Sequence, residues 1–541
     1  MKNSISKKTM LTLLTASMIL SVSGCGGEKK ETAVNTNNET LNLETAAPES
    51  YNLPIGEDLS FKVVTTLQPV VAGQNISFND VAAFKEMEQV TGVKIDFQHI
   101  TNEKRNLLFA SNDLPDMFII NWENGSPMKY AQDGQIYKLD GLLSQYAPNF
   151  VNLLKENESI VPQIVEADNG IYYFPFLRND PELRIFAGFQ IRQDWLDKVN
   201  MEVPKTKEEL YRVLKAFKEN DMNGNGINDE YPIITEKGKG LDYMLYWWGI
   251  GEFYVDSSDK IQCGWLQPEY KDYVAWLNQL YNEGLIDPDY AILDKNQFEA
   301  KISNGQSGVW YGLAGGTLGR LSTLMASIDP NFELTALPWL QAEDGNSYVL
   351  NTEYISVNNT NLGLAITQQC SNAEAAVKWA DFAYSEQGNL LLNFGAEGES
   401  YEMKDGVPTY TDLITNNPNL SMSETLQQYC IPSGYPMSQN PYYFDQYMTP
   451  IQKDAINVWK QCDISRTVPV LKYTQEEVPV ATNKFNELKS YNNEMLNKFI
   501  TGKESLDHFD SYIDTLTKMG INDVIAVQQS AYDRYKTLRS N

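Results

Sequence analysis

The segment Leu59-Ser60-Phe61-Lys62-Val63-Val64-Thr65-Thr66 begins the pattern that decides the fold, because its β-branched and apolar residues are typical of a strand. Residues 79–92 then place apolar side chains at helical spacing, and residues 93–97 predict a second strand. A second helix is expected over 105–110 and a third strand over 117–120. This alternation of strands and helices indicates an α/β domain with a largely parallel sheet.

Amphipathic helices continue along the chain. Residues 206–220 place several apolar side chains on one face and begin with a capping box formed by Thr206 and Glu209. Residues 268–284 and 372–384 are also expected to be helical, as is most of the C-terminal region. With 541 residues, the chain has room for two domains with substantial cores.

The composition disfavours several classes of function. A formal net charge of −28 makes nucleic acids and anionic lipid surfaces poor partners. The two histidines, His99 and His508, lie far apart and outside any zinc or Ser-His-Asp pattern. Four further cysteines form no CxxC pair, and whether they form disulfides or stay free is open. They are Cys263, Cys370, Cys430 and Cys462.

The N-terminus has the features of an export signal followed by one cysteine. Lysines precede an apolar run over 10–22 that is too short to span a bilayer, and small residues lead into Cys25. This pattern resembles the lipobox of bacterial lipoproteins, in which the cysteine is lipidated; an ordinary signal peptide with a chance cysteine is the alternative. We expect a signal peptide over 1–24, a lipid on Cys25 and a flexible tether over 25–54. The protein would then sit on the extracytoplasmic face of the cell membrane.

Several motifs follow one another in a characteristic order. They are Ala110-Ser111-Asn112-Asp113-Leu114-Pro115-Asp116, Ile191-Arg192-Gln193-Asp194-Trp195-Leu196-Asp197-Lys198, Leu280-Tyr281-Asn282-Glu283-Gly284-Leu285-Ile286-Asp287-Pro288 and Gly395-Ala396-Glu397-Gly398-Glu399-Ser400-Tyr401. Together they resemble the extracellular solute-binding proteins of sugar ABC transporters, from about residue 58 to the end of the chain. The likeness is greatest to the lipoprotein subgroup that includes LplA-type and alginate-oligosaccharide-binding proteins.

The resemblance implies an α/β, two-lobed periplasmic-binding-protein fold of type II, in which a hinge joins the lobes and the ligand binds in the cleft between them. By similarity, lobe 1 comprises 55–170 plus 352–400, and lobe 2 comprises 171–351 plus 401–541. The implied function is binding of a carbohydrate, here an oligosaccharide, by a monomer that delivers it to the permease subunits of an ABC transporter without catalysis.

The segment Asp221–Glu230 matches the front half of a calcium-binding loop. Oxygen-bearing side chains stand at positions 1, 3, 5 and 9, glycines at positions 4 and 6 permit a tight turn, and position 7 can offer a carbonyl. Position 12 is Pro232, so Glu230 at position 10 is the available replacement for the usual glutamate, as in the alginate-binding relatives. We expect a structural Ca²⁺, with an ion-free Asx-rich turn as the alternative. The expected ligands are Asp221, Asn223, Asn225, the carbonyl of Ile227 (its side chain turned toward the core), Asp229 and Glu230.

Proteins bind sugars through aromatic faces that pack on pyranose C–H groups and through polar groups that bind hydroxyls. Aromatic residues in loop-like stretches are therefore candidates, and Trp122 is attractive because it follows the third strand. Each tryptophan can instead be a core residue. The family motifs add Arg192 and Glu399, either of which could instead form an internal salt bridge. The candidate ligand-binding residues are Trp122, Arg192, Trp247, Trp248, Trp265, Trp310, Tyr311 and Glu399.

Two other functions compete with transport. An extracellular glycoside hydrolase or lyase would need a pair of carboxylates, and no spacing among the 71 acidic residues singles one out. A sensory lipoprotein would bind the same ligand and signal through a partner. A neighbouring pair of permease genes would favour transport, a neighbouring histidine kinase would favour sensing, and cleaved oligosaccharide products would favour the enzyme.

Overall fold

The computed structural model describes residues 41–46, 48–67, 70–71, 74–75, 77–358 and 360–540. The predicted signal peptide, the lipidation of Cys25 and part of the predicted tether lie outside these residues. Among the helices that the structure describes, none combines the length and apolar character needed to cross a membrane.

The first lobe is built on a five-stranded sheet with the order β4-β1-β5-β12-β6. The strands β4, β1 and β5 are parallel, as the strand-helix pattern predicted, whereas β12 runs antiparallel to both β5 and β6. The sheet is therefore mixed, because a segment from much later in the chain returns to complete it. The strands are β1 (Leu59–Thr65), β4 (Val93–His99), β5 (Met117–Asn121), β6 (Phe174–Pro175) and β12 (Leu362–Ile366).

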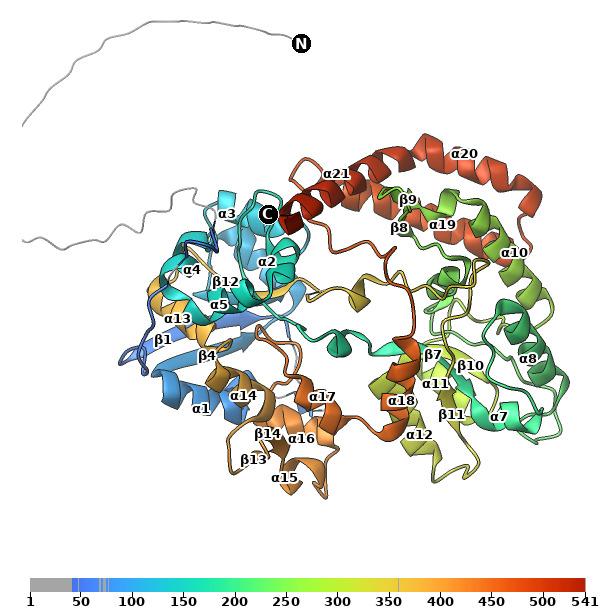
Figure 1. Cartoon of the computed structure of the whole chain (residues 1–541), viewed down its shortest axis with the longest axis horizontal. Helices are drawn as coiled ribbons and strands as arrows, with labels where there is room; N and C mark the ends of the chain where they lie inside the picture. The colour runs from blue at the N-terminus through green and yellow to red at the C-terminus, as the bar shows by residue number, and fades with distance from the viewer. Residues whose placement is uncertain are drawn as a thin grey trace, which may run out of the picture. The chain divides into compact units, whose positions relative to one another are not determined.

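Helices lie around this sheet (Figure 1), and buried apolar side chains of both form one hydrophobic core. Helix α1 packs on β4 and α13 packs on β12. Gly92 ends α1 in the left-handed conformation, at a φ of 69°, which glycine adopts without strain. The helices around this sheet are α1 (Ala82–Thr91), α2 (Asn102–Ser111), α3 (Ser126–Gln132), α4 (Asp140–Tyr146), α5 (Pro148–Glu156), α6 (Val161–Ile164), α13 (Ala373–Phe382) and α14 (Glu386–Phe394).

The second lobe contains an antiparallel three-stranded sheet with the order β10-β7-β11. The predicted helix over 206–220 is present as α8 (Lys207–Glu219), and the Thr206 and Glu209 capping box forms as expected. Its apolar face packs into the largest core of the lobe. The strands are β7 (Ala187–Arg192), β10 (Val309–Leu313) and β11 (Leu334–Ala336), and the main helices are α7 (Gln193–Lys198), α8, α10 (Pro268–Asn282), α11 (Lys295–Ser303) and α12 (Arg320–Met325).

The C-terminal region is largely helical, as predicted. Helix α19 packs on α10 of the second lobe, and the end of α21 contacts α6 of the first. The helices are α18 (Pro450–Trp459), α19 (Phe485–Ile500), α20 (Phe509–Met519) and α21 (Ile521–Ser540).

Residues 401–447 form a small hairpin and short helices. Tyr401 and Tyr410 share a hydrophobic cluster with Phe394 at the end of α14, so this segment packs against the first lobe. The elements are β13 (Tyr401–Lys404), β14 (Val407–Tyr410), α15 (Asp412–Thr415), α16 (Met422–Tyr429) and α17 (Pro441–Tyr447). The cysteines at 263, 370, 430 and 462 are free thiols.

Candidate functional site

A cavity of about 420 Å³ is lined by segments from both lobes and by the extended segment 468–473. Asn124 follows the carboxyl end of β5 and Asn361 precedes β12, so both asparagines come from one edge of the five-stranded sheet. Tyr246 and Glu252 line it from the second lobe. A cavity at the carboxyl end of a sheet strand, shared between two lobes, is where α/β proteins commonly bind ligands. We call it the interlobe cavity.

The polar groups of the interlobe cavity can bind hydroxyl groups in pairs. The Asn361 side-chain oxygen accepts a hydrogen bond from Lys472 Nζ at 2.9 Å, and its amide nitrogen lies 3.4 Å from the side-chain oxygen of Asn124. The Tyr473 hydroxyl donates to Gln528 Oε1 at 2.8 Å. Amides have both donors and acceptors, so a wall of amides suits a polyol.

An aromatic row stands behind the second-lobe wall of the interlobe cavity. The ring of Tyr246 lies 5.8 Å from that of Tyr243, whose ring in turn lies 4.3 Å from that of Tyr311. Tyr243 and Tyr311 are half-buried, and so is Phe253, which lines the cavity. Partly exposed rings next to polar groups are the combination that packs against a sugar face.

One carboxylate of the same wall has an ammonium partner and a second carboxylate nearby. Glu252 lines the cavity and pairs with Lys489 at 2.7 Å. Burial raises the pKa of Glu252, Lys489 counteracts that rise, and the nearby Asp242 adds to it. Burial likewise raises the pKa of Asp242. The side chains of Glu252 and Lys489 are nevertheless 35% and 41% exposed, and Asp242 is exposed, so solvent partly screens these charges.

Four of the predicted tryptophans are in the hydrophobic cores. Trp122, Trp247, Trp265 and Trp310 are each at most 3% exposed. Trp122 donates its indole N–H to the carbonyl of Gly363 at 3.1 Å, and Trp310 donates to Gln190 Oε1 at 2.9 Å. Trp265 stacks on Phe485. Rings enclosed in this way offer no free face to a sugar, so these four positions have the core role that was the alternative for each.

Trp248 and Tyr311 are more accessible than the other predicted aromatics. Lys207 Nζ lies 5.0 Å from the centre of the Trp248 ring, and both residues are partly exposed. Neither Trp248 nor Tyr311 lines the interlobe cavity directly. Tyr311 belongs to the aromatic row behind the cavity, and this position supports its proposed role in ligand binding.

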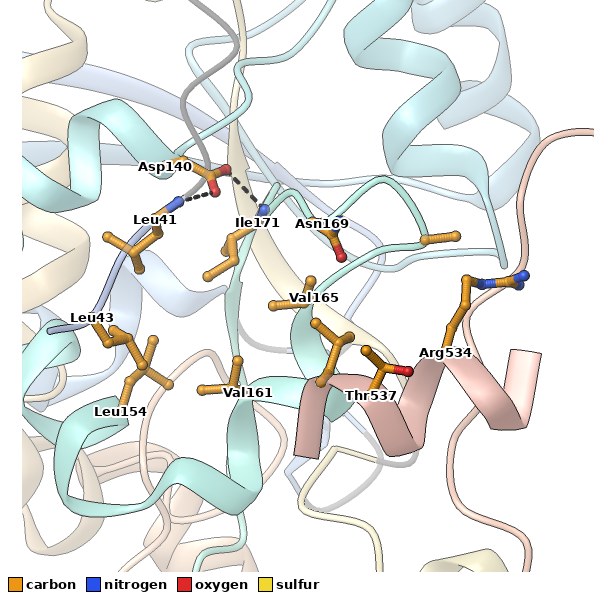
Figure 2. Close-up of a pocket in the computed structure, with 12 residues that line it drawn as sticks. Leu41, Leu43, Asp140, Leu154, Val161, Val165, Asn169, Ile171, Arg534 and Thr537 are labelled. Carbon is orange, nitrogen blue, oxygen red and sulfur yellow. Dashed lines mark hydrogen bonds between the residues drawn. The ribbon is translucent and has the colours of Figure 1, made fainter. Parts of the chain in front are cut away.

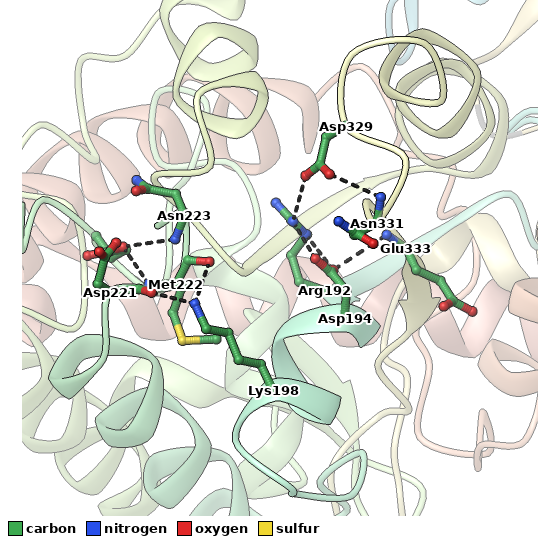
Figure 3. Close-up of polar contacts among 10 residues, drawn as sticks. Arg192, Asp194, Lys198, Asp221, Met222, Asn223, Asp329, Asn331 and Glu333 are labelled. Carbon is green, nitrogen blue, oxygen red and sulfur yellow. Dashed lines mark hydrogen bonds and ion pairs between the residues drawn. The ribbon is translucent and has the colours of Figure 1, made fainter. Parts of the chain in front are cut away.

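Arg192 and Glu399 do not contact the interlobe cavity. Arg192 is 3% exposed and binds Asp194 in bidentate fashion, through Nε to Oδ1 at 2.7 Å and Nη2 to Oδ2 at 2.5 Å (Figure 3). Its guanidinium also lies 4.3 Å from the centre of the Phe332 ring. These contacts match the internal salt bridge considered as the alternative for Arg192. Glu399 is exposed, and its carbonyl accepts a hydrogen bond from the Thr411 hydroxyl.

The predicted calcium loop adopts a compact turn held by its own oxygens. Asp221 Oδ1 accepts hydrogen bonds from the backbone N–H groups of Gly224 and Asn225 at 2.7 and 3.1 Å. The side chains of Asn223 and Asn225 both donate to Asp229 Oδ1 at 3.2 Å. Figure 3 shows Lys198 bound beside Asp221, through the backbone carbonyl. The expectation that the Ile227 side chain turns toward the core is wrong: it is 62% exposed, because the loop lies at the surface.

The donor set of this loop fits a hard cation. Glu230 is fully buried, and while its Oε1 accepts from the Met222 N–H at 2.8 Å, its Oε2 has no hydrogen-bond partner. A buried carboxylate oxygen without a partner is costly unless something pairs with it. Carboxylate and amide oxygens from four other residues of the loop are the ligands that Ca²⁺ prefers. Among the described residues, no cluster of three or more histidine, cysteine or acidic side chains is arranged to hold a metal, so a site here would depend on the asparagines.

A second cavity of about 420 Å³ has a different character (Figure 2). Its lining is mostly leucine, isoleucine and valine, from the segment Leu41–Leu43, from α5 and α6, and from the end of α21. Asp140 accepts hydrogen bonds from the N–H groups of Leu41 and Ile171 at 2.8 and 3.0 Å. This cavity has no aromatic platform and few free polar groups, so it is a poor site for a sugar.

Sequence reasoning missed the residues that line the interlobe cavity, although it came close to two of them. Tyr246 precedes the predicted Trp247, and Asn124 follows the predicted Trp122 by two positions. The turn η4 (Leu245–Trp248) directs Trp247 into the core and leaves Tyr246 at the cavity. Asn361 and Gln528 had no sequence signal, because tertiary contacts alone bring them to this place.

Comparisons with known proteins agree with this architecture. The family described as bacterial extracellular solute-binding protein matches residues 68–390. The fructooligosaccharide ABC transporter substrate-binding protein FusA of Streptococcus pneumoniae is 26% identical, over 97% of this chain and 97% of its own length. The lipoprotein LipO of Bacillus subtilis is 26% identical, over 84% of this chain and 89% of its own length. The crystal structure of the alginate-binding protein AlgQ2 without calcium ion has a TM-score of 0.69 and 25% identity, covering 88% of this chain and 98% of that one.

Proposed function

Because the chain belongs to the bacterial extracellular solute-binding protein family, we propose that it binds an oligosaccharide in the interlobe cavity and delivers it to the permease subunits of an ABC transporter. The observation that carries the proposal is this cavity, in which asparagines from one lobe face a tyrosine and a carboxylate from the other. A ligand that contacts both walls favours the closed arrangement of the lobes, and a closed lobe pair can be recognised by a permease. The relative FusA, named for fructooligosaccharide transport, supports the same class of ligand.

Thermal unfolding of the purified full-length protein with a panel of oligosaccharides tests this function. A ligand at 100 times its Kd stabilises the folded form by about 2.7 kcal/mol, so the melting temperature should rise with a matching sugar. Asn124→Ala should weaken binding at least about tenfold, since one residue of a hydroxyl-binding pair typically contributes on the order of 1.4 kcal/mol. Asn416→Ala, at an exposed position outside the cavity, is the matched control. No response to any sugar would refute the proposal.

We further propose that binding leaves the sugar intact. Glu252, which lines the cavity, is engaged by Lys489 at 2.7 Å, and neither histidine is among the described residues that line the cavity. Chromatography of oligosaccharides after prolonged incubation with the protein should therefore recover them unchanged. Cleaved products would instead indicate a glycoside hydrolase or lyase.

The membrane attachment is also a proposal. A lipid on Cys25, after removal of residues 1–24, would hold a monomer at the extracytoplasmic face of the membrane, and the similarity to lipoprotein LipO supports it. Cys25→Ala should release the protein from the membrane fraction into the medium, whereas Cys370→Ala should not. If neither variant were released from the membrane fraction, lipidation of Cys25 would be refuted as the means of attachment.

The division into lobes remains a proposal as well. We propose a first lobe of 55–170 plus 352–400 and a second lobe of 171–351 plus 401–541. The core contacts favour extending the first lobe through β6 and over the hairpin and helices of 401–447. Hydrogen exchange with and without ligand would locate the segments that change protection at the hinge.

We propose that the loop Asp221–Glu230 holds a structural Ca²⁺. Asp221, Asn223, Asn225, the carbonyl of Ile227, Asp229 and Glu230 would be the ligands, and the ion would neutralise carboxylates that otherwise repel one another. The unpartnered Oε2 of buried Glu230 supports this assignment. Chelation should lower the melting temperature, and Asp221→Ala should abolish the effect. Asp256→Ala is the matched control, because Asp256 also caps a turn through two backbone N–H groups. If a chelator left the melting temperature unchanged, a structural Ca²⁺ in this loop would be excluded.

A further inference from the structure

The interlobe cavity is lined by polar groups that are mostly uncharged. Its described lining includes four side-chain amides, three hydroxyls and one carboxylate, and no lysine or arginine: Asn124, Asn351, Asn361, Gln528, Tyr246, Thr352, Tyr473 and Glu252. Polar groups of this kind satisfy sugar hydroxyls. They provide no counter-charge for an acidic sugar.

The cations near the cavity already have protein partners. Lys472 is buried against Glu166, with Nζ 3.0 Å from Oε1. Lys489 pairs with Glu252 at 2.7 Å. Arg466 donates to the carbonyl of Gly249 at 3.0 Å. Arg178 lies against Phe176 and Phe186 and does not line the cavity. A uronate carboxylate in this cavity would therefore meet no cation among these that lacks a protein partner.

The local charge works against anions as well. Glu252 lines the cavity and pairs with Lys489 at 2.7 Å, and the exposed Asp242 lies near enough to interact with both, so the three groups carry one net negative charge when ionised. A uronate carboxylate at this wall would lose part of its hydration without gaining a cationic partner, and the net negative charge would repel it. A neutral oligosaccharide meets neither cost, and its hydroxyls can donate to Glu252.

We propose that the interlobe cavity is selective for uncharged oligosaccharides, and that Glu252 is a specificity-determining residue that accepts hydroxyl hydrogen bonds and repels uronates. The proposal rests on the proposed function, because it concerns the same cavity. It commits to a substrate class that the family membership leaves open, since AlgQ2 is named for alginate and FusA for fructooligosaccharides.

Titration calorimetry on the purified full-length protein tests the selectivity. The probes are neutral fructo-, gluco- and manno-oligosaccharides against oligogalacturonates and oligoalginates of matched length. The wild type should bind at least one neutral series at least about 100-fold more tightly than any uronate series. Glu252→Gln should reduce that preference by about tenfold, because it leaves Lys489 without its partner and makes the wall neutral. The double variant Glu252→Gln/Asp242→Asn should reduce it further. Glu219→Gln removes an exposed carboxylate on a helix surface and should leave the preference unchanged.

The possible outcomes separate the two proposals. Tight uronate binding by the wild type would overturn the selectivity proposal and leave the sugar-binding function intact. The same holds if Glu252→Gln and the double variant keep the preference for neutral sugars while both remain folded by circular dichroism. Binding of neither class by the wild type would overturn the function itself. If the preference for neutral sugars over uronates falls in Glu252→Gln and stays the same in Glu219→Gln, the result would support Glu252 as the specificity-determining residue.

Discussion

The buried ion pair between Lys472 and Glu166 gives the sharpest prediction of stability. The two side chains are 6% and 2% exposed, and Nζ lies 3.0 Å from Oε1. Lys472 Nζ also donates to the Tyr173 hydroxyl at 3.0 Å and to Asn361 at 2.9 Å. Burial alone would lower the pKa of Lys472, but Glu166 and Tyr173 raise it overall. The lysine is thus charged at neutral pH, and its contribution is complete below the unfolded pKa of about 10.4 and is lost as pH rises through the raised value.

Removing one partner should leave the other charge buried and uncompensated. Lys472→Met and Glu166→Gln should each lower the free energy of unfolding by about 3–5 kcal/mol, and the double variant should lose less than the sum of the two. Urea unfolding at pH 7 measures this. Lys129→Met is the control, since Lys129 and Asp133 form an exposed i,i+4 pair, at 61% and 49% side-chain exposure, that contributes under about 1 kcal/mol. If Lys472→Met lost no more stability than Lys129→Met, the reasoning about this pair would be refuted.

Three further predictions concern packing, a helix cap and a strand position. Gly188→Ala would place a Cβ 2.3 Å from the Trp459 ring and should destabilise the protein by about 1–3 kcal/mol in thermal unfolding, whereas Gly141→Ala, with nothing within 4 Å, should not lower the melting temperature. Thr206→Ala should lose about 1 kcal/mol, because Thr206 Oγ1 accepts from the Glu209 N–H at 3.1 Å; a loss below about 0.3 kcal/mol would contradict this. Gly363→Ala should also destabilise by about 1–3 kcal/mol, since its Cβ would meet the Tyr173 ring at 2.1 Å, and an unchanged midpoint would show that the ring moves freely.

The local pattern of the chain was predictable, because it depends on residues that are neighbours in sequence. The alternation of strands and helices over 59–120 and the capping box of α8 follow from periodicity and from Thr206 and Glu209. The antiparallel return of β12 to β5 did not follow, since no local signal pairs residues about 240 positions apart. Likewise, family likeness predicted two lobes, but the packing of 401–447 depends on contacts of Phe394 with Tyr401 and Tyr410.

The candidate site was predictable in kind and not in its residues. Aromatic abundance and the family motifs pointed to a sugar-binding cleft, yet Trp122 and Trp247 are in the core while Asn124 and Tyr246 line the cavity. The residues that line the cavity lie one or two positions away from the predicted ones. The geometry of the turn decides which side chain faces the cavity, and amino-acid composition does not reveal that geometry. The compact turn over Asp221–Glu230 was predictable because its oxygen-bearing side chains lie within ten residues of one another, and the ion that it would hold stays a proposal.

The position of a bound oligosaccharide in a crystal structure of the complex tests the central claim most directly. We expect a sugar between the two lobes, with hydroxyls within hydrogen-bond distance of Asn124, Asn361 and Glu252 and one ring against the half-buried Phe253. A sugar seated instead in the apolar cavity beside Leu154 and Val161, or on the outer surface of either lobe, would contradict it.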